Sequence, residues 1–422
     1  MESPRTSPAS ITGQAPGMGR RELVVILAFS QALQALAIDT ILPGLSQLAR
    51  DLHAADPNQG QLVVGVFMLG IGLGALIPGP LADRFGRKPV LLVCLALSTA
   101  MTLGCMFVAT IGQMLVLRFV SGVICAGMAV VPPAIIRDRF EGDRMASLQS
   151  LIGVIFLVVP MVAPSLGQLI LLFAGWRWIF GLIALLGAAM GLWIALRLPE
   201  TLDPAHRQAI DVRSIGRNMR MVMTTRASIG YILGGACSVG VMWGYIQSSQ
   251  QLVGEHFGAG EAFPLIFGLM ALCMAFANLA NSRIVERFGA RRVAHTALLF
   301  YIAIALLQFY LAHRGTETLW QFVPVMTLTM MCMGFTGANF IAIGLQPFAR
   351  MAGAASSVQT FVRNSLGGLI GAFVGQAYDG SARPLSSALV IAGGVILCLL
   401  LWSEEGRLFR RLHPPGTARP IA

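Results

Sequence analysis

Charged residues are scarce in this sequence. They make up only 12% of the 422 residues, whereas 56% of the residues are hydrophobic. A soluble globular domain is about a quarter charged, and one soluble core of this size could not bury so much apolar surface. The composition therefore excludes an ordinary soluble protein and indicates that a lipid bilayer surrounds most of the chain.

Sequence patterns typical of metal, redox and nucleotide sites are also missing. The cysteines lack the paired spacing of zinc or redox motifs and are expected to be buried thiols without disulfides. The histidines form no cluster, and no Gly-Lys-Ser/Thr loop is present to bind phosphate. We therefore expect no metal, no cofactor and no enzymatic activity. The cysteines are Cys94, Cys105, Cys125, Cys237, Cys273, Cys332 and Cys398.

Long apolar stretches recur along the chain, each close to the roughly 20 residues that a helix needs to cross a bilayer. Backbone groups in lipid must bond internally, and the alternation of barrel strands is absent, so these stretches are expected to be helices. The predicted spans are residues 22–45, 58–82, 89–109, 112–136, 147–172, 177–197, 227–253, 262–284, 293–313, 319–344, 352–378 and 384–402.

One long polar gap divides these twelve predicted spans into two groups of six. We read the gap as a cytoplasmic linker between two bundles, and the ends of the chain as cytoplasmic tails, the first of them rich in Pro, Ser and Gly and so expected to be disordered. The predicted organisation is a tail at 1–21, an N-terminal bundle at 22–198, a linker at 199–226, a C-terminal bundle at 227–403 and a tail at 404–422.

Basic residues are distributed unevenly among the segments that join the spans. With the N-terminus in the cytoplasm, 24 of the 30 arginine and lysine residues fall in cytoplasmic segments, four fall in outer segments, and Arg118 and Arg363 lie within spans. This asymmetry follows the positive-inside rule. The net charge of +11 is thus explained by the cytoplasmic face of a membrane protein, and we expect no nucleic-acid partner.

The two halves resemble each other at one conspicuous place. The run Asp83-Arg84-Phe85-Gly86 follows the second span, and Glu286-Arg287-Phe288-Gly289 follows the eighth, 203 residues later. A chance match of loop composition is the alternative, but the topological position also matches. The pattern therefore predicts an internal repeat of two six-helix halves, which is typical of transporters.

The segment at residues 79–90 reads GPLADRFGRKPV. Glycines there allow close helix approach and a tight turn, and the acid can pair with the basic residues that follow. Positive-inside charge alone would explain the arginines but not the acid or the glycines. The segment resembles the loop motif G-x-L-a-D-r-x-G-r-K of the major facilitator superfamily, which latches the two bundles in the outward-open state. The resemblance implies a latch formed by Gly79, Asp83, Arg84, Gly86, Arg87 and Lys88.

An acid lies inside the first span. Asp39 falls in the middle or outer half of that helix, in the run Leu36-Ala37-Ile38-Asp39-Thr40-Ile41-Leu42-Pro43. A charge at this depth is costly unless it is paired, hydrated or neutralised by a proton, which are the properties that a proton carrier uses. The alternative is a structural aspartate that bonds a neighbouring helix.

Arg118 lies a few residues inside the fourth span. It either extends to the outer interface as an anchor or faces the bundle interior and acts on Asp39. Its surroundings resemble the superfamily's span-4 motif l-x-x-x-R-x-x-q-G, with Ser121 where the family often has glutamine. We therefore predict Asp39 and Arg118 as the proton-coupling residues.

The fifth span contains two prolines, which remove helix hydrogen bonds and predict a kink at a bundle interface. Any kinked membrane helix would share that feature. The run resembles the antiporter motif g-x-x-x-G-P-x-x-G-G, although Val159, Ala163 and Gln168 replace glycines. The resemblance implies antiport rather than symport, with a kink formed by Pro160, Ala163, Pro164 and Gly167.

Further short runs narrow the resemblance to the Bcr/CflA group of drug–proton antiporters, which export bicyclomycin and chloramphenicol. Some members of that group carry a second acid where this chain has Gln31, so Asp39 is expected to be the main titrating group. The resemblance implies a monomer in the bacterial cytoplasmic (inner) membrane, with both termini cytoplasmic. The runs are Ala37-Ile38-Asp39 with Leu42-Pro43, Arg137-Asp138, Ala163-Pro164 with Gly167, Trp176–Phe180 and Leu198–Thr201.

The C-terminal half lacks counterparts of Asp39 and Arg118, so coupling is expected in the N-terminal bundle. Arg363 lies about three turns inside its span, where it either binds an anionic or electronegative group of the substrate or pairs with a neighbouring acid or carbonyl. Aromatic, methionine and amide side chains would form an adaptable pocket, although each alone is often a packing residue. The predicted substrate-binding residues are Gln31, Gln34, Phe67, Met68, Phe156, Trp243, Tyr245, Gln247, Asn339, Gln359 and Arg363.

Taken as a whole, the sequence predicts an all-α integral membrane protein with a major facilitator fold of twelve transmembrane helices in two six-helix bundles. The expected function is export of small amphipathic drugs such as phenicol- or bicyclomycin-like compounds, driven by the proton gradient, with a small-molecule substrate, protons and the lipid bilayer as partners. Two alternatives remain: a proton-coupled carrier of sugars or amino acids, and a non-transporting membrane receptor, for which the short linker and tails offer no signalling domain.

Overall fold

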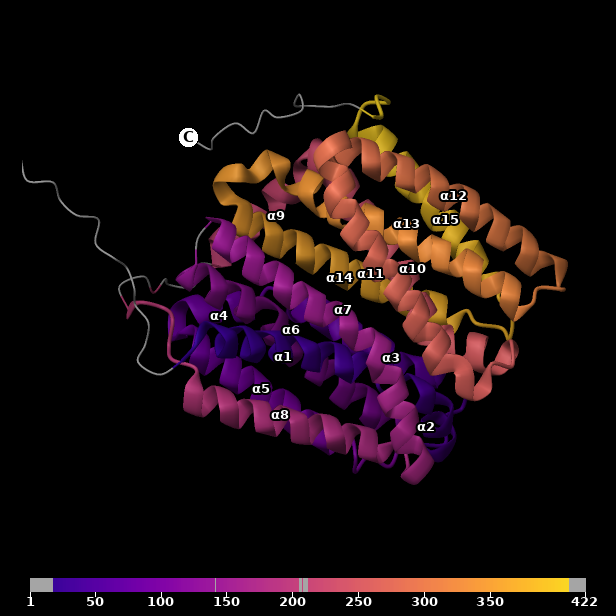
Figure 1. The fold of residues 1–422 in the computed structure, drawn as a ribbon, viewed down its shortest axis with the longest axis horizontal. Coiled ribbons are helices and arrows are strands. Elements are labelled where there is room, and N and C mark those ends of the chain that lie inside the picture. Colours follow the sequence, from indigo (N-terminus) through magenta and orange to yellow (C-terminus); the bar gives the residue numbers. More distant parts are fainter. Residues whose placement is uncertain (1–17, 141, 205–206, 208–211, 410–422) are drawn as a thin grey trace, which may run out of the picture.

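The computed structural model describes residues 18–140, 142–204, 207 and 212–409, and all regular elements in these ranges are helices (Figure 1). Most of them are long and run roughly along the long axis of the molecule, with the N-terminal half on one side and the C-terminal half on the other. The arrangement is that of two helical bundles lying side by side.

The N-terminal half comprises eight α-helices and one short 3-10 helix. Gly142–Phe173 forms one helix that contains both Pro160 and Pro164. The helices are α1 (Arg20–Asp39), η1 (Leu42–Gly44), α2 (Leu45–Asp51), α3 (Gln59–Gly74), α4 (Pro78–Phe85), α5 (Arg87–Gly104), α6 (Ile111–Arg139), α7 (Gly142–Phe173) and α8 (Arg177–Arg197).

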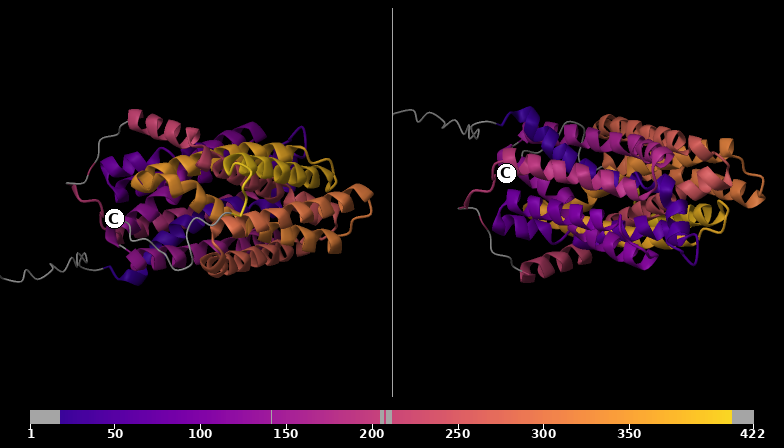
Figure 2. Two further views of the ribbon diagram at one scale, coloured as in Figure 1. Left: turned by 90° about the horizontal axis from the view of Figure 1, so that it is seen from above. Right: turned by 90° about the horizontal axis from the view of Figure 1, so that it is seen from below.

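The C-terminal half begins with a short helix in the predicted linker, which the sequence interpretation had treated as a plain connection. This helix, α9, packs against α14 and α10 and lies at the edge of one end of the molecule (Figure 2). The helices are α9 (Val212–Thr224), α10 (Arg226–Ser249), η3 (Gln250–His256), η4 (Gly260–Ala262), α11 (Phe263–Phe288), α12 (Ala290–Arg314), α13 (Leu319–Leu345), η5 (Gln346–Met351), α14 (Ala352–Gln376) and α15 (Arg383–Ser403).

Each predicted span coincides with a helix, but two spans are broken. The first stops at Asp39 and continues through η1, which carries Pro43, into α2. The second is divided into α3 and α4, which meet at an angle of 49°. Pro78 begins α4, and proline cannot continue the hydrogen-bond ladder of a preceding helix.

The apolar lengths fit a membrane protein. Within the described ranges, nine helices are long and apolar enough to cross a bilayer, or ten if α3 and α4 form one span, and the apolar part of α7 that is described, Val158–Phe173, is shorter. The fold class is that predicted, while the number of twelve spans stays a prediction.

The two halves repeat one local structure. Gly86 ends α4 with φ 105° and ψ 153°, and Gly289 ends α11 with φ 84° and ψ 146°. A positive φ of this kind favours glycine, which has no Cβ to clash with the backbone. The repeat that the sequence predicted is thus visible in the backbone.

The loops gather at two ends of the molecule. Figure 1 shows α4 and α9 at one end, which we call the α9 end, and α2 at the opposite end, the α2 end. Among described residues, side-chain hydrogen bonds between the halves lie at the α2 end. They join Ser46 to Glu255, Gln61 to Gln251, and Asn58 to the segment at 376–378.

Candidate functional site

The carboxylate of Asp39 lies at the end of α1, where the helix gives way to η1. The residue is only 4% exposed. Among the residues that the structure describes, it has no hydrogen-bond or ion-pair partner. A buried and unpaired carboxylate inside a membrane span is costly to keep ionised, so this position favours exchange of a proton or contact with a ligand.

Arg118 holds the chain around Asp39 without pairing with it. Its side chain, 1% exposed, donates from Nε to the carbonyl oxygen of Val63 at 3.1 Å and from Nη2 to that of Ala37 at 2.8 Å. The guanidinium also lies 4.0 Å from the ring centroid of Phe67. The arginine is therefore an interior residue rather than an interface anchor, and its link to Asp39 runs through the backbone of α1.

Gly167 brings α7 against the same point of α1. A Cβ at this position would collide with the carbonyl oxygen of Thr40, the residue after Asp39. Six residues, or somewhat less than two turns, back along α7, the carbonyl oxygen of Met161 lies where it would crowd a Cβ on Gly268 of α11. The helix with the antiporter-like motif thus contacts both the end of α1 and the other half of the molecule.

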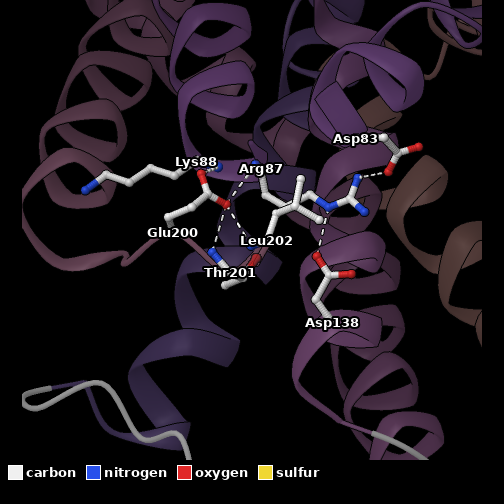
Figure 3. Close-up of polar contacts among 7 residues, drawn as sticks. All are labelled: Asp83, Arg87, Lys88, Asp138, Glu200, Thr201 and Leu202. Atoms are coloured by element: carbon white, nitrogen blue, oxygen red, sulfur yellow. Dashed lines mark hydrogen bonds and ion pairs between the residues drawn. The ribbon is translucent and has the colours of Figure 1, made fainter. Parts of the chain in front are cut away.

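The predicted latch segment forms an ion-pair cluster at the α9 end (Figure 3). Arg87 lies between two acids, 2.6 Å from Asp83 and 2.8 Å from Asp138. Its side chain is 4% exposed, whereas that of Asp83 is 38% exposed. All three residues belong to the N-terminal half, so in this arrangement Asp83 is engaged within its own bundle.

Glu200, just after α8, binds the beginning of α5. Its Oε1 accepts a hydrogen bond from the backbone N–H of Arg87 at 2.9 Å, and its Oε2 accepts one from that of Lys88 at 3.2 Å. A Cβ on Gly86 would collide with this carboxylate, which is a second reason for glycine there. The acid supplies partners for N–H groups that the first turn of a helix leaves free.

The C-terminal half uses an acid in the corresponding place. Glu404, just after α15, lies 2.7 Å from Arg291 near the start of α12 and accepts a hydrogen bond from Tyr231 at 2.7 Å. Burial favours a higher pKa for Glu404, but the hydrogen bonds from Arg291 and Tyr231 outweigh it and lower the pKa. In both halves, therefore, an acid just after the last helix binds the start of the helix that follows the glycine turn: Glu200 binds α5, and Glu404 binds α12.

Comparison with known proteins then decides the family. A model of the Major Facilitator Superfamily matches residues 27–372. The chain belongs to the major facilitator superfamily. It is therefore a multi-pass membrane transporter and not an enzyme.

Relatives of this transporter agree with that assignment, and a solved structure of another protein shares its fold. It is 27% identical over 365 residues to a bicyclomycin resistance protein homolog of Haemophilus influenzae, covering 86% of this chain and 91% of the relative. It is 30% identical over 370 residues to the multidrug resistance protein MdtL of Klebsiella pneumoniae, covering 86% and 91%. A D-xylose–proton symporter structure has the same fold, with a TM-score of 0.70, 13% identity and coverage of 90% and 96%.

The remaining predicted latch and kink residues are placed as follows in the transporter. Arg84 is exposed and lies over the ring of Phe85. A Cβ on Gly79 would meet only Val130, at an ordinary 3.7 Å, so close helix approach does not require glycine there. Ala163, Pro164 and Gly167 are buried and Pro160 is partly buried.

The predicted substrate-binding residues differ in their surroundings. Several are packing residues in this arrangement: Phe67 and Tyr245 are wholly buried, and Met68 is 1% exposed. Asn339 donates a hydrogen bond to Asn281 at 2.9 Å. The side chain of Phe156 lies outside the described residues. Gln31, Gln34 and Trp243 are partly buried, and Gln247 and Gln359 are buried with amide atoms that lack partners among described residues.

Arg363 is the unusual member of this set. It is the twelfth residue of α14, about 17 Å along the helix from its start, and lies beside Gly235 of α10. Its Nε is buried without an acceptor among the described residues, which also supply no ion pair. The residue as a whole is only partly buried, so its guanidinium is available to a ligand.

Three functional contacts were missed from the sequence. These are Asp138 as a partner of Arg87, Glu200 at the start of α5, and Phe67 beneath Arg118. Asp138 and Glu200 both stand in short runs that carried the family resemblance, which was the one available signal. Phe67 was predicted as a substrate-binding residue, but nothing in the sequence pointed to its contact with Arg118.

Proposed function

We propose that this transporter exports small amphipathic compounds, phenicol- or bicyclomycin-like antibiotics among them, in exchange for protons by alternating access. The observation that carries the proposal is the position of Asp39. It is buried at the end of α1, unpaired by described residues, and flanked by a carbonyl bound to Arg118 and by the close approach of Gly167.

The physical argument starts from the cost of an isolated carboxylate in a medium of low dielectric constant. Such a group is stabilised by a proton, by water or by a polar ligand. A proton and a substrate that compete for the Asp39 carboxylate are thereby coupled. Along the whole sequence, Asp39 is the one acid placed deep in a predicted span, so we assign the coupling to it alone.

The direction of transport follows from the proposed orientation. The arginine-rich α9 end is assigned to the cytoplasm together with both termini. Hydrogen bonds such as that from Asn58 Nδ2 to the carbonyl oxygen of Tyr378, 2.7 Å, then close the outer side, and the arrangement corresponds to an inward-facing carrier. Substrate enters from the cytoplasm while Asp39 is deprotonated.

Export follows when the two bundles rock. Asp83, exposed beside Arg87 in this arrangement, then moves toward the C-terminal half and holds the cytoplasmic side closed. A proton from outside neutralises Asp39 and weakens substrate binding, so the substrate leaves and the protonated carrier returns. The proton gradient supplies the energy, and we propose a monomer without a cofactor.

Arg363 supports a preference among substrates. The deep span positions hold one acid, Asp39, and two cations, Arg118 and Arg363, so the interior repels cationic compounds. An anion would bind more tightly once a proton has neutralised Asp39. Proton and substrate would then bind together, whereas antiport requires that one displace the other. We therefore propose compounds without net charge that carry an acceptor group for Arg363. The names of the relatives in bicyclomycin and multidrug resistance support the same class.

The experiment is transport by purified protein in liposomes with an imposed pH gradient. Chloramphenicol efflux should require the gradient and should stop on addition of an uncoupler. An Asp39→Asn variant should lose gradient-driven transport, whereas Asp56→Asn, an exposed acid in the loop after α2, should retain it. Transport that proceeds unchanged without a gradient, or in Asp39→Asn, would refute proton antiport.

A further inference from the structure

A groove of about 700 Å³ lies on the C-terminal half, away from Asp39. Its walls are α11 and α12, and side chains of α13 form its floor. Phe409, which follows α15, borders it. The lining residues are Ile284, Phe288, Arg292, Val293, Thr296, Ala297, Phe300, Cys332, Phe335 and Phe409.

The groove results from how these helices pack. The chain turns at Gly289, with φ 84°, so the end of α11 lies beside the start of α12, and α13 packs against both helices. Phe288 and Phe300, on opposite walls, are 48% and 62% exposed. Large exposed aromatic residues on transmembrane helices face the hydrocarbon of the bilayer, so the groove opens toward lipid.

The mouth of the groove is basic, and its interior is lined by apolar side chains. Residues 283–292 contain four arginines and one glutamate. Arg291 is engaged by Glu404. Arg292 lines the groove, and its Nε donates a hydrogen bond to the carbonyl oxygen of Phe409 at 3.2 Å, which leaves its Nη groups for another acceptor. From Arg292 the groove follows α12 to Phe300, about 12 Å along the helix.

We propose that this groove binds one phospholipid with an anionic headgroup. The phosphate contacts Arg292 at the mouth, and an acyl chain lies over Phe300 and Phe335. The length, the basic mouth and the apolar walls match the distribution of charge along a phospholipid molecule. The orientation given under Proposed function places the groove in the cytoplasmic leaflet. The lipid would therefore come from that leaflet, and this part of the inference rests on the proposed function.

Other occupants fit less well. Water would have few polar partners among the lining residues, and a cationic drug would meet the arginines at the mouth. A neutral drug carries no charge for the basic mouth to attract and could offer Arg292 only a neutral acceptor, which makes a weaker hydrogen bond than a phosphate. The chain beyond Phe409 is a rival that the experiment distinguishes.

The test is native mass spectrometry of the full-length protein in detergent, titrated with phosphatidylglycerol or phosphatidylethanolamine of identical acyl chains. Wild-type protein should bind one phosphatidylglycerol more tightly than phosphatidylethanolamine. Because a basic residue near a membrane surface attracts anionic lipid by about a factor of five, Arg292→Gln should weaken phosphatidylglycerol binding about fivefold. It should weaken phosphatidylethanolamine binding less, because the ammonium of that headgroup already offsets the charge of its phosphate. Arg220→Gln, an exposed arginine on α9, is the control for charge and should bind like wild type.

A second variant tests the groove itself. Ala297→Trp fills it and should weaken binding of both lipids, with the thermal unfolding midpoint in lipid-free detergent confirming that the variant is folded. Equal affinity for the two lipids in wild type, or unchanged binding in Arg292→Gln, would overturn the proposal. So would a several-fold rise in lipid binding when the chain is cut after Phe409. Because no transport is measured, failure of proton antiport would leave these results unchanged.

Discussion

The guanidinium of Arg118 donates a hydrogen bond of 2.8 Å to the carbonyl oxygen of Ala37, two residues before Asp39. A second hydrogen bond joins the same guanidinium to Val63 of α3. One cation thus ties α1, α3 and α6 together at the depth of the proposed proton site. Its link to Asp39 is indirect, because it holds the backbone of α1 two residues before the carboxylate and forms no ion pair with it.

Replacing Arg118 should therefore affect stability as well as transport. Arg118→Ala leaves the carbonyl oxygen of Ala37, in the last turn of α1, without a donor in a buried site, which costs roughly 1–3 kcal/mol. Val63 lies inside α3 and keeps its helical hydrogen bond. Arg118→Lys keeps the charge but lacks the planar fork that reaches both carbonyls. Thermal unfolding in detergent should show a large loss for the alanine variant and a smaller loss for lysine. Midpoints equal to wild type in both variants would contradict the assigned role.

Substitution of Gly167 tests the contact between α7 and α1. Gly167→Ala places a methyl group against the carbonyl oxygen of Thr40, and overpacking of this kind costs roughly 1–3 kcal/mol or displaces a helix. We expect slower gradient-driven drug efflux. The matched control is Gly394→Ala in α15, where a Cβ would have no neighbour within 4 Å. Equal loss in the two variants would mean that helix propensity, not this contact, is responsible.

In the proposed orientation, closure of the outer side depends on Asn58, which donates to the carbonyl oxygen of Tyr378 at 2.7 Å. Loss of one such bond is worth about 1 kcal/mol, or about a fivefold shift in a two-state equilibrium. Asn58→Ala should therefore raise the outward-open population. Distances between labels attached through unnatural amino acids at Ala54 and at Ala377, which is exposed, would measure it. Gln59→Ala, which removes a bond to Ala55 within the same half, should leave the distances unchanged.

Glu317 predicts a pH dependence of stability that is independent of transport. It lies between α12 and α13, and burial raises its pKa from 4.5 to about 7, although Gln308 donates a hydrogen bond to it. The folded protein then binds the proton more tightly than the unfolded chain does, so stability is highest below pH 4.5 and falls as the pH rises to about 7.

Glu317→Gln should flatten this dependence. Unfolding midpoints of wild type and variant, measured at about pH 5 and about pH 8, should differ less in the variant. Glu261→Gln, an exposed acid before α11, is the control and should behave as wild type. A variant profile that keeps the full slope would show that another group titrates.

Local patterns predicted the parts of the fold that depend on neighbours in sequence. The turn at Gly86 and its counterpart at Gly289 follow from short runs of residues, and apolar length locates the helices. The breaks at Pro43 and Pro78 were predictable from proline but were not predicted. The apolar composition continues through both prolines and hides the break.

Contacts between segments that are distant in the chain could not be predicted from the sequence. Arg118 bonds backbone carbonyls, and every residue has one, so no residue type marks the partner. The approach of Gly167 to Thr40 depends on how α7 crosses α1, which the motif does not specify. Arg363 was identified as a cation about three turns inside its span, but only the structure shows that the described residues leave it unpaired.

The central claim is that the Asp39 carboxylate exchanges a proton for substrate. The most direct test is the release of protons when chloramphenicol is added to purified protein in weakly buffered detergent, followed with a pH indicator. We predict release by wild type and by Asp56→Asn, and none by Asp39→Asn. Undiminished release from a folded Asp39→Asn variant would contradict the account.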